Sequence, residues 1–228
     1  MANNARFPDC RAVVFDLDGT LIDSAGDITV AMNRVLAAHG RRPLTAVEIR
    51  GMLGDGARDL VRRVFAATGS APSAAETPVL LEQYLDSYAQ VPAEPSCLYP
   101  GAIETLDRLA AAGLTLALCT NKAERITRLV LDQLGLGGRF QVVLGGDALP
   151  QRKPDPRVLG WVVERLELPA AAMVMVGDGI NDVLSARALN MPAVAVSYGY
   201  PRMPVAELGA DVVIDALPEL VPLVAAEG

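Results

Sequence analysis

Six short apolar runs, separated by longer helical patterns, constrain the fold of this chain more than any other feature. The runs consist mainly of valine, leucine, isoleucine, alanine and methionine, without the polar alternation expected of a strand that has one face in water. Continuous apolar strands suit a parallel sheet that is covered by helices on both faces. The runs are residues 11–15, 114–119, 141–144, 173–176, 193–196 and 212–214.

Helical stripes lie between the apolar runs throughout the last 130 or so residues. Apolar residues recur there at intervals of three and four, the spacing of one helix face. Alternation of strand and helix predicts a Rossmann-like, doubly wound α/β domain. The stripes are Ile103, Leu106, Leu109 and Ala110; Ile126, Leu129, Val130 and Leu134; and Val158, Val162, Val163 and Leu166.

The region from residue 24 to residue 97 has a different character, because it carries helical patterns and no comparable strand. Thr45 is a suitable helix N-cap, and Glu48 three residues later completes a capping box. We therefore expect a helical module inserted after the first strand of the sheet. The amphipathic stretches within it are residues 28–38, 46–53, 57–67 and 77–89.

Composition excludes several classes of function. Hydrophobic residues make up 51% of the 228 residues, enough for a sizeable core, and the net charge of −7 argues against binding to nucleic acid or anionic membranes. No apolar stretch reaches membrane-spanning length. Cys10, Cys97 and Cys119 have no metal-ligand spacing and are expected to be reduced thiols, so we expect a cytoplasmic protein.

Polar segments follow the predicted strands at the edge where open α/β sheets bind ligands. Asp16 and Asp18 come directly after the first strand, and two carboxylates so close together favour a hard cation such as Mg²⁺ beside them. Thr120 and Asn121 follow the second strand, where a hydroxyl and free backbone N–H groups can hold phosphate oxygens. Taken singly, these segments fit an ordinary turn and a helix cap equally well.

Two further polar segments complete the set. Lys153 stands in a loop just before Pro154, and only it and Lys122 are lysines among the 20 basic side chains, so it is less easily explained as a solvated surface charge. Asp178 follows an apolar strand, and Asp182 lies one helical turn later. Acidic residues at a helix N-terminus also have a purely structural explanation in the helix dipole.

The four segments together, in this order and each near a strand end, resemble the haloacid dehalogenase-like superfamily over nearly the whole chain. Within it, the stretch DLDGTLIDS at residues 16–24, Tyr99-Pro100-Gly101, Thr120-Asn121-Lys122 and residues 153–156 (KPDP) look like bacterial phosphoglycolate phosphatases. The resemblance implies an α/β core domain of residues 1–23 and 98–228. It also implies a helical cap domain of residues 24–97.

The resemblance assigns a role to each segment. Asp16 is the nucleophile and Asp18 the general acid and base. Mg²⁺ is held by Asp16, the backbone carbonyl of Asp18 and Asp178, and Asp182 orients groups around the metal. The residues implied to bind phosphate are Thr120, Asn121 and Lys153.

The resemblance also bears on substrate. Gly54 and Gly56 look like the specificity loop of the cap, and nearby Arg58, Arg62 or Arg63 is a candidate to meet a substrate carboxylate. A solvated helix face explains these arginines too. Asp18 argues against the dehalogenase branch, and the absence of lysine from residues 24–97 excludes the phosphonate-cleaving branch.

We expect a phosphatase acting on a small phosphorylated metabolite, with 2-phosphoglycolate the first choice. The alternatives are a phosphatase for a sugar phosphate or pyrophosphate, a phosphosugar mutase, and a non-catalytic regulatory protein on the same fold. No nucleic-acid or membrane partner is expected, and the chain is expected to be a monomer or a homodimer.

Overall fold

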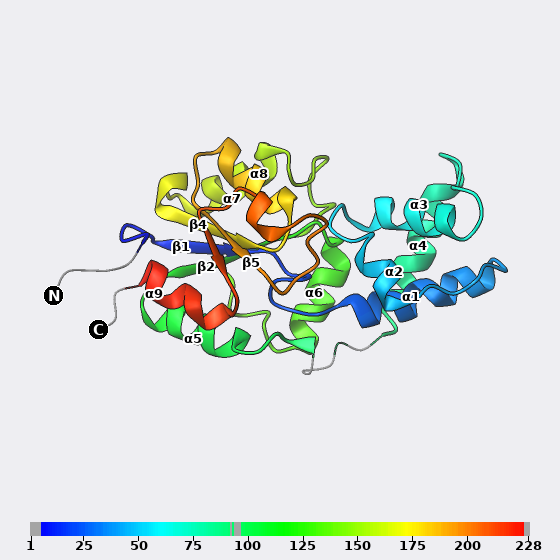
Figure 1. Ribbon diagram of the computed structural model, residues 1–228, viewed down its shortest axis with the longest axis horizontal. Helices are drawn as coiled ribbons and strands as arrows, with labels where there is room; N and C mark the ends of the chain where they lie inside the picture. The colour runs from blue at the N-terminus through cyan, green and yellow to red at the C-terminus, as the bar shows by residue number, and fades with distance from the viewer. Residues whose placement is uncertain (1–5, 92, 94–96, 226–228) are drawn as a thin grey trace.

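The computed structural model describes residues 6–91, 93 and 97–225 of the chain. A sheet with helices on both faces forms one part of the molecule, and helices α1–α4 lie beside one end of it (Figure 1). None of the helices in the described residues is both long enough and apolar enough to cross a membrane.

The sheet has six strands, all parallel, in the order β3-β2-β1-β4-β5-β6. This confirms the doubly wound α/β fold expected from the sequence. The strand order reverses between β1 and β4, and ligands bind outside the carboxyl ends of the strands at such a point. The strands are β1 (Ala12–Phe15), β2 (Thr115–Cys119), β3 (Val142–Leu144), β4 (Met173–Gly177), β5 (Ala193–Val196) and β6 (Val212–Ile214).

Strand β1 is fully buried, because helices cover both faces of the sheet. Alternate residues of a strand point to opposite faces. Val13 and Phe15 accordingly belong to one apolar cluster, while Ala12 and Val14 belong to another. Helices α5 (Ala102–Ala111), α6 (Glu124–Gln133) and α9 (Val221–Val224) contribute to the first cluster. Helices α7 (Pro156–Leu166) and α8 (Ile180–Ala188) contribute to the second.

The four helices inserted between β1 and α5, here called the insert helices, pack on one another. They are α1 (Ala25–Ala38), α2 (Ala46–Arg50), α3 (Ala57–Ala67) and α4 (Glu76–Tyr88), with α4 lying against both α1 and α3. The capping box predicted at Thr45 and Glu48 is present at the start of α2. Helix α2 ends at Arg50, earlier than the expected residue 53, because the chain turns there toward Gly54 and Gly56, both of which have positive φ.

The two connections between the insert helices and the sheet run side by side. Asp23 N donates to Cys97 O at 2.7 Å, and Tyr99 N donates to Leu21 O at 3.0 Å. The apolar cluster on one face of the sheet continues into the insert helices through residues such as Leu17 and Ile28. The insert therefore packs against the carboxyl edge of the sheet, where the polar segments lie.

Candidate active site

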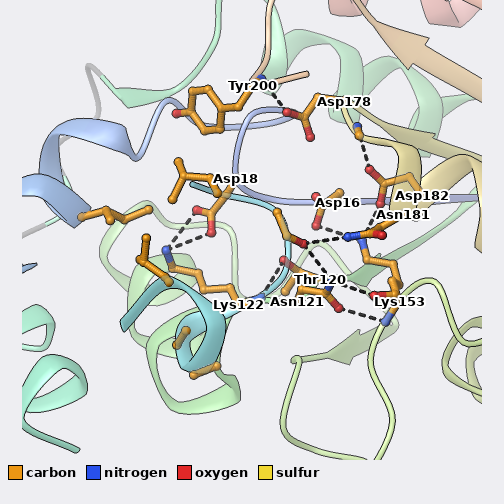
Figure 2. A pocket seen from close by; sticks show the side chains of 18 of the residues that line it. Asp16, Asp18, Thr120, Asn121, Lys122, Lys153, Asp178, Asn181, Asp182 and Tyr200 are labelled. Atoms are coloured by element: carbon orange, nitrogen blue, oxygen red, sulfur yellow. Dashed lines mark hydrogen bonds and ion pairs between the residues drawn. The ribbon is translucent and has the colours of Figure 1, made fainter. Parts of the chain in front are cut away.

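The structure brings the predicted polar residues together in one cavity of about 190 Å³. This volume is below the ~300–1,000 Å³ of pockets for drug-sized ligands, so the cavity suits a small molecule. Figure 2 shows the labelled side chains of these residues converging from the ends of β1, β2 and β4, from the start of α8 and from the loop before α7. The predicted residues that line the cavity are Asp16, Asp18, Gly54, Gly56, Thr120, Asn121, Lys153, Asp178 and Asp182.

Backbone pairing of β1 with β4 explains why Asp16 and Asp178 meet. Asp16 N donates to Val176 O at 2.9 Å, so the two strands end level with each other. Gly19 then turns the chain with a φ of +83°, and a Cβ at this position would lie 2.3 Å from Asp178 Oδ2. Only glycine therefore permits the loop after β1 to approach Asp178 so closely.

Three carboxylates form a cluster that could hold a metal ion. One oxygen from each of Asp16, Asp178 and Asp182 lies within 4.8 Å of the others. Lys153 supplies one positive charge to the cluster, which leaves an excess of two negative charges among these four groups. The Asp16 Oδ1 atom is buried and makes no hydrogen bond, although Lys153 Nζ is 3.1 Å away. A divalent cation that prefers oxygen ligands would balance the two excess negative charges. It would also give Asp16 Oδ1 the partner that this buried oxygen lacks.

The pKa values of the carboxyl groups reflect this crowding. Burial raises the pKa of Asp16 to about 6, against the opposing effect of the Lys153 charge and with a further rise from Asp182. Burial, followed by the charges of Asp182 and Asp16, raises the pKa of Asp178 well above its ordinary value. Without a cation, these groups are held in an environment that favours their protonated forms.

Lys153 is fixed at the base of the cavity. Its ammonium group donates to Asp182 Oδ1 and to Cys119 O, each at 2.6 Å, and only 1% of its side chain is exposed. The Asn121 side chain holds the backbone of Lys153 with two hydrogen bonds of 3.0 Å, since its Nδ2 donates to Lys153 O and its Oδ1 accepts from Lys153 N. Burial by itself lowers the pKa of Lys153, but the charges of Asp16 and Asp182 raise it above its ordinary value, so the ammonium stays charged.

Asp182 already uses both of its carboxylate oxygens. Oδ1 accepts from Lys153, and Oδ2 accepts from the backbone N–H of Gly179 at 3.1 Å. Asp178, by contrast, accepts one hydrogen bond within the described residues, from Tyr200 N to Oδ2 at 2.6 Å (Figure 2). The geometry therefore favours Asp16 and Asp178 as metal ligands, with Asp182 positioning Lys153.

Asp18 lies in the same cavity but has separate partners. Ser24 Oγ donates to its Oδ1 at 2.6 Å, and Lys122 Nζ donates to its two oxygens at 3.0 and 3.2 Å. Lys122 also donates to the hydroxyl of Tyr88, at the end of α4. Sequence reasoning did not place Lys122 or Tyr88 in the site. The scarcity of lysine was the available signal, because both lysines of the chain line the cavity.

The loop between α2 and α3 contacts the sheet's carboxyl edge directly. Gly54 O accepts hydrogen bonds from the side chains of Asn121 and Asn181, at 2.9 and 3.1 Å. Arg58 is exposed and is not among the residues that line the cavity. Within the described part of the chain, the arginine that lines it is Arg202, from the loop after β5. No local pattern in the sequence distinguished that residue.

Fold and site together define a hydrolase of a known class. Residues 10–190 match the family model of the haloacid dehalogenase-like hydrolases. This match covers more than half of the chain and includes all four polar segments. The chain belongs to the haloacid dehalogenase-like hydrolase family.

Particular relatives resemble the chain along most of its length. It is 41% identical over 210 residues to the phosphoglycolate phosphatase of Agrobacterium fabrum, covering 92% of this chain and 90% of that one. It is 44% identical over 209 residues to the phosphoglycolate phosphatase of Rhodospirillum rubrum, covering 90% and 87%. A crystal structure described as a predicted phosphoglycolate phosphatase from Haemophilus somnus has a TM-score of 0.87 at 28% identity, covering 93% of this chain and 96% of that chain.

Proposed function

We propose that this protein hydrolyses a small phosphomonoester, best represented by 2-phosphoglycolate, through a phosphorylated Asp16. One observation carries the proposal: Asp16 lines the cavity and has a buried carboxylate oxygen, Oδ1, that makes no hydrogen bond and lies 3.1 Å from the ammonium of Lys153. A carboxylate in this setting can attack an anionic ester because a fixed cation reduces the repulsion between them.

The reaction proceeds in two displacements on phosphorus. In the first, a carboxylate oxygen of Asp16 bonds to phosphorus and the bond to the ester oxygen breaks. Asp18 donates a proton to the departing alcohol oxygen. In the second, Asp18 accepts a proton from water, which attacks the phosphoryl group, releases inorganic phosphate and restores Asp16. Acid–base assistance of this kind is typically worth about 10²–10⁴ in rate.

The groups that bind phosphate lie at the carboxyl end of β2 and in the loop before α7. Lys153 offers its ammonium, and the Thr120 hydroxyl and the Asn121 backbone N–H are the neighbouring donors. The Asn121 N–H donates to no group among the described residues, so it remains available to an oxygen of the substrate. The Asn121 side chain has a different role, because it joins Lys153 to Gly54. These donors stabilise the charge that develops on the phosphoryl oxygens.

Mg²⁺ is the metal that best suits this donor set, with Asp16, Asp178 and the backbone carbonyl of Asp18 as its protein ligands. All three are oxygen donors, and the cluster's excess of two negative charges matches a divalent ion. When bound, Mg²⁺ offsets the repulsion between Asp16 and the phosphoryl group and stabilises charge in the transition state. Asp182 then keeps Lys153 oriented beside Asp16.

Asp178→Asn is expected to weaken metal binding while stabilising the metal-free protein. A raised carboxyl pKa means that the metal-free protein loses stability as the pH rises through that pKa, and Asp178→Asn removes the Asp178 charge that would repel Asp16 and Asp182. For the unaltered protein, Mg²⁺ at 100 times its Kd should raise the free energy of unfolding by about 2.7 kcal/mol, which corresponds to roughly 5–10 °C in Tm. Thermal unfolding at pH 7.5 with chelator and with Mg²⁺ measures both effects; a Mg²⁺ stabilisation undiminished in the variant would contradict the ligand assignment.

The insert helices, α1–α4, are proposed to act as a cap over the cavity, within the cap domain of residues 24–97 expected from the sequence. They contribute Ile28, Leu60 and Tyr84 to its wall, so the substrate is enclosed between insert and sheet. Enclosure excludes water while the phosphoryl group is transferred to Asp16, and it lets the insert contact the non-phosphate end of the substrate.

The choice of 2-phosphoglycolate rests on the relatives and on the small volume of the cavity. Phosphoglycolate phosphatases from two organisms are 41% and 44% identical to this chain over about nine-tenths of it. A two-carbon ester also fits a cavity of about 190 Å³. A sugar phosphate or pyrophosphate remains the second candidate, because Asp16, Lys153 and Asp178 would treat its phosphoryl group in the same way.

A panel of phosphomonoesters tests the proposal. With Mg²⁺, the purified protein should release phosphate from 2-phosphoglycolate with a higher kcat/KM than from sugar phosphates or pyrophosphate. Chelation of divalent ions should abolish release, and added Mg²⁺ should restore it. Phosphate release that is unaffected by chelator would overturn the metal assignment, and isomerisation of a sugar phosphate without release would identify a mutase instead.

A further inference from the structure

Asp55, in the loop between α2 and α3, holds an arginine from the opposite side of the cavity. Its carboxylate accepts two hydrogen bonds from Arg202, from Nη1 at 2.6 Å and from Nη2 at 2.8 Å. Asn181 donates to the same carboxylate at 2.9 Å, and Arg63 of α3 pairs with it as well. The bidentate hydrogen bonding between Arg202 and Asp55 fixes the plane of the Arg202 guanidinium.

The charges at this point do not balance. One carboxylate, Asp55, faces two guanidinium groups, those of Arg63 and Arg202, which leaves one positive charge in excess. Arg152 is not part of this count, because it pairs with Asp59 at 3.4 Å and donates to the backbone oxygen of Asp55 rather than to its carboxylate. A second anion can therefore be accommodated next to Arg202 at low electrostatic cost.

Among the cations that line the cavity, Arg202 has the most unused hydrogen-bond donors. Lys122 has three N–H donors and contacts three oxygens, two of Asp18 and the hydroxyl of Tyr88. Lys153 uses two of its three N–H donors, for Asp182 and Cys119 O, and its ammonium lies 3.1 Å from Asp16 Oδ1. A guanidinium has five N–H donors, and the hydrogen bonds to Asp55 use two of those of Arg202.

Arg202 also lies within electrostatic range of the reaction centre. Its pKa is raised, first by the hydrogen bonds to Asp55 and, to a smaller extent, by the charges of Asp55 and Asp178. Much of the remaining cavity wall is apolar and cannot bind a charged group. Its apolar members include Ile28, Leu53, Leu60, Leu85, Ile126 and Met203.

We propose that Arg202 binds the carboxylate of the substrate and thereby selects phosphomonoesters that carry a second anionic group. The inference rests on the proposed phosphatase function and names a specificity residue for it. Because Asp55 belongs to the insert and Arg202 to the loop after β5, the guanidinium is oriented only while the insert loop is docked on the sheet's edge. Recognition of the carboxylate is therefore coupled to docking of the insert.

The test compares two substrates of the same length, 2-phosphoglycolate and ethyl phosphate. The first has a carboxylate at the position where the second has a methyl group. Arg202→Met keeps an unbranched, largely apolar side chain and removes the guanidinium group with its charge. We expect kcat/KM for 2-phosphoglycolate to fall about 10- to 100-fold, the range of a charge-assisted hydrogen bond, while kcat/KM for ethyl phosphate stays within roughly threefold. Competitive inhibition by inorganic phosphate should be unchanged, because the phosphoryl site is intact.

Two further variants separate recognition from structure. Arg58→Met is the matched control, an exposed arginine outside the cavity, and should keep the unaltered preference between the two substrates. Asp55→Asn leaves the charge of Arg202 but weakens its anchor, so it should lower kcat/KM for 2-phosphoglycolate less than Arg202→Met does.

The outcomes distinguish this inference from the proposed function. An equal loss for both substrates in Arg202→Met, or a change of preference in Arg58→Met instead, would overturn the role of Arg202. An unaltered protein that turns over both substrates equally well would overturn 2-phosphoglycolate as the substrate and Arg202 as its selector. An unaltered protein that releases phosphate from no ester at all would overturn the phosphatase function itself.

Discussion

Asp16→Asn is expected to abolish Mg²⁺-dependent phosphate release, with a loss of kcat of at least about 10⁴-fold, as for removal of other enzymatic nucleophiles. The substitution keeps the shape of the side chain but removes the charge that attacks phosphorus. The fold should be retained, because the raised pKa of Asp16, about 6, shows that burial already disfavours its charged form. Steady-state phosphate release measures the first effect and thermal unfolding the second.

A surface aspartate provides the control for this variant. Asp9 is exposed and precedes β1, so Asp9→Asn makes the same chemical change outside the cavity and should leave kcat unaltered. Trapping with acid after a brief reaction should reveal a phosphorylated chain in the unaltered protein and none in Asp16→Asn. Undiminished turnover by Asp16→Asn would show that another group is the nucleophile.

Lys153→Met is expected to cost both activity and stability. The variant leaves Asp16 and Asp182 buried without their cation, and breaking a buried ion pair in this way typically costs about 3–5 kcal/mol. The pKa of Lys153 is raised by these carboxylates, so its stabilising effect is fully present below the ordinary lysine pKa, including at neutral pH. We expect Tm with chelator to fall by roughly 6–20 °C and kcat by at least about 10²-fold.

The double variant Lys153→Met with Asp182→Asn separates the two effects. It removes the carboxylate that Lys153 contacts at 2.6 Å, so part of the lost stability should return. Activity should not return, because no ammonium remains next to Asp16. If the double variant regained most of the original kcat, Lys153 would act only as a structural partner of Asp182 and would not bind the phosphoryl group.

The fold was predictable from the sequence because the signals that define it are local. The strands of a sheet covered on both faces are continuous apolar runs, and few other structures produce six of them between helical stripes. The observed strands agree with the predicted runs to within a residue at each end. The sequence pattern extends α2 to residue 53, beyond its observed end at Arg50, because the apolar residues after Arg50 belong to a turn whose course depends on contacts with the sheet.

The polar residues at the strand ends were predictable for a related reason. Parallel strands end at one edge, so Asp16, Thr120 and Asp178 had to lie close together once the strands were identified. The partners of Asp18 were not predictable in this way. Lys122 reaches it from 104 positions away, and Tyr88 reaches Lys122 from the insert, and no periodicity in the sequence reports such pairings.

The sequence by itself determined the parallel sheet, the inserted helices and the set of carboxylates and lysine at the strand ends, because each depends on short-range pattern and on strand direction. Tertiary structure alone decided which arginine faces the cavity. Arg58 is near the loop of Gly54 in sequence but points to solvent, whereas Arg202 is 147 positions from Asp55 and pairs with it. Such a contact depends on how two distant loops dock across the cavity, and docking follows from packing of the whole chain.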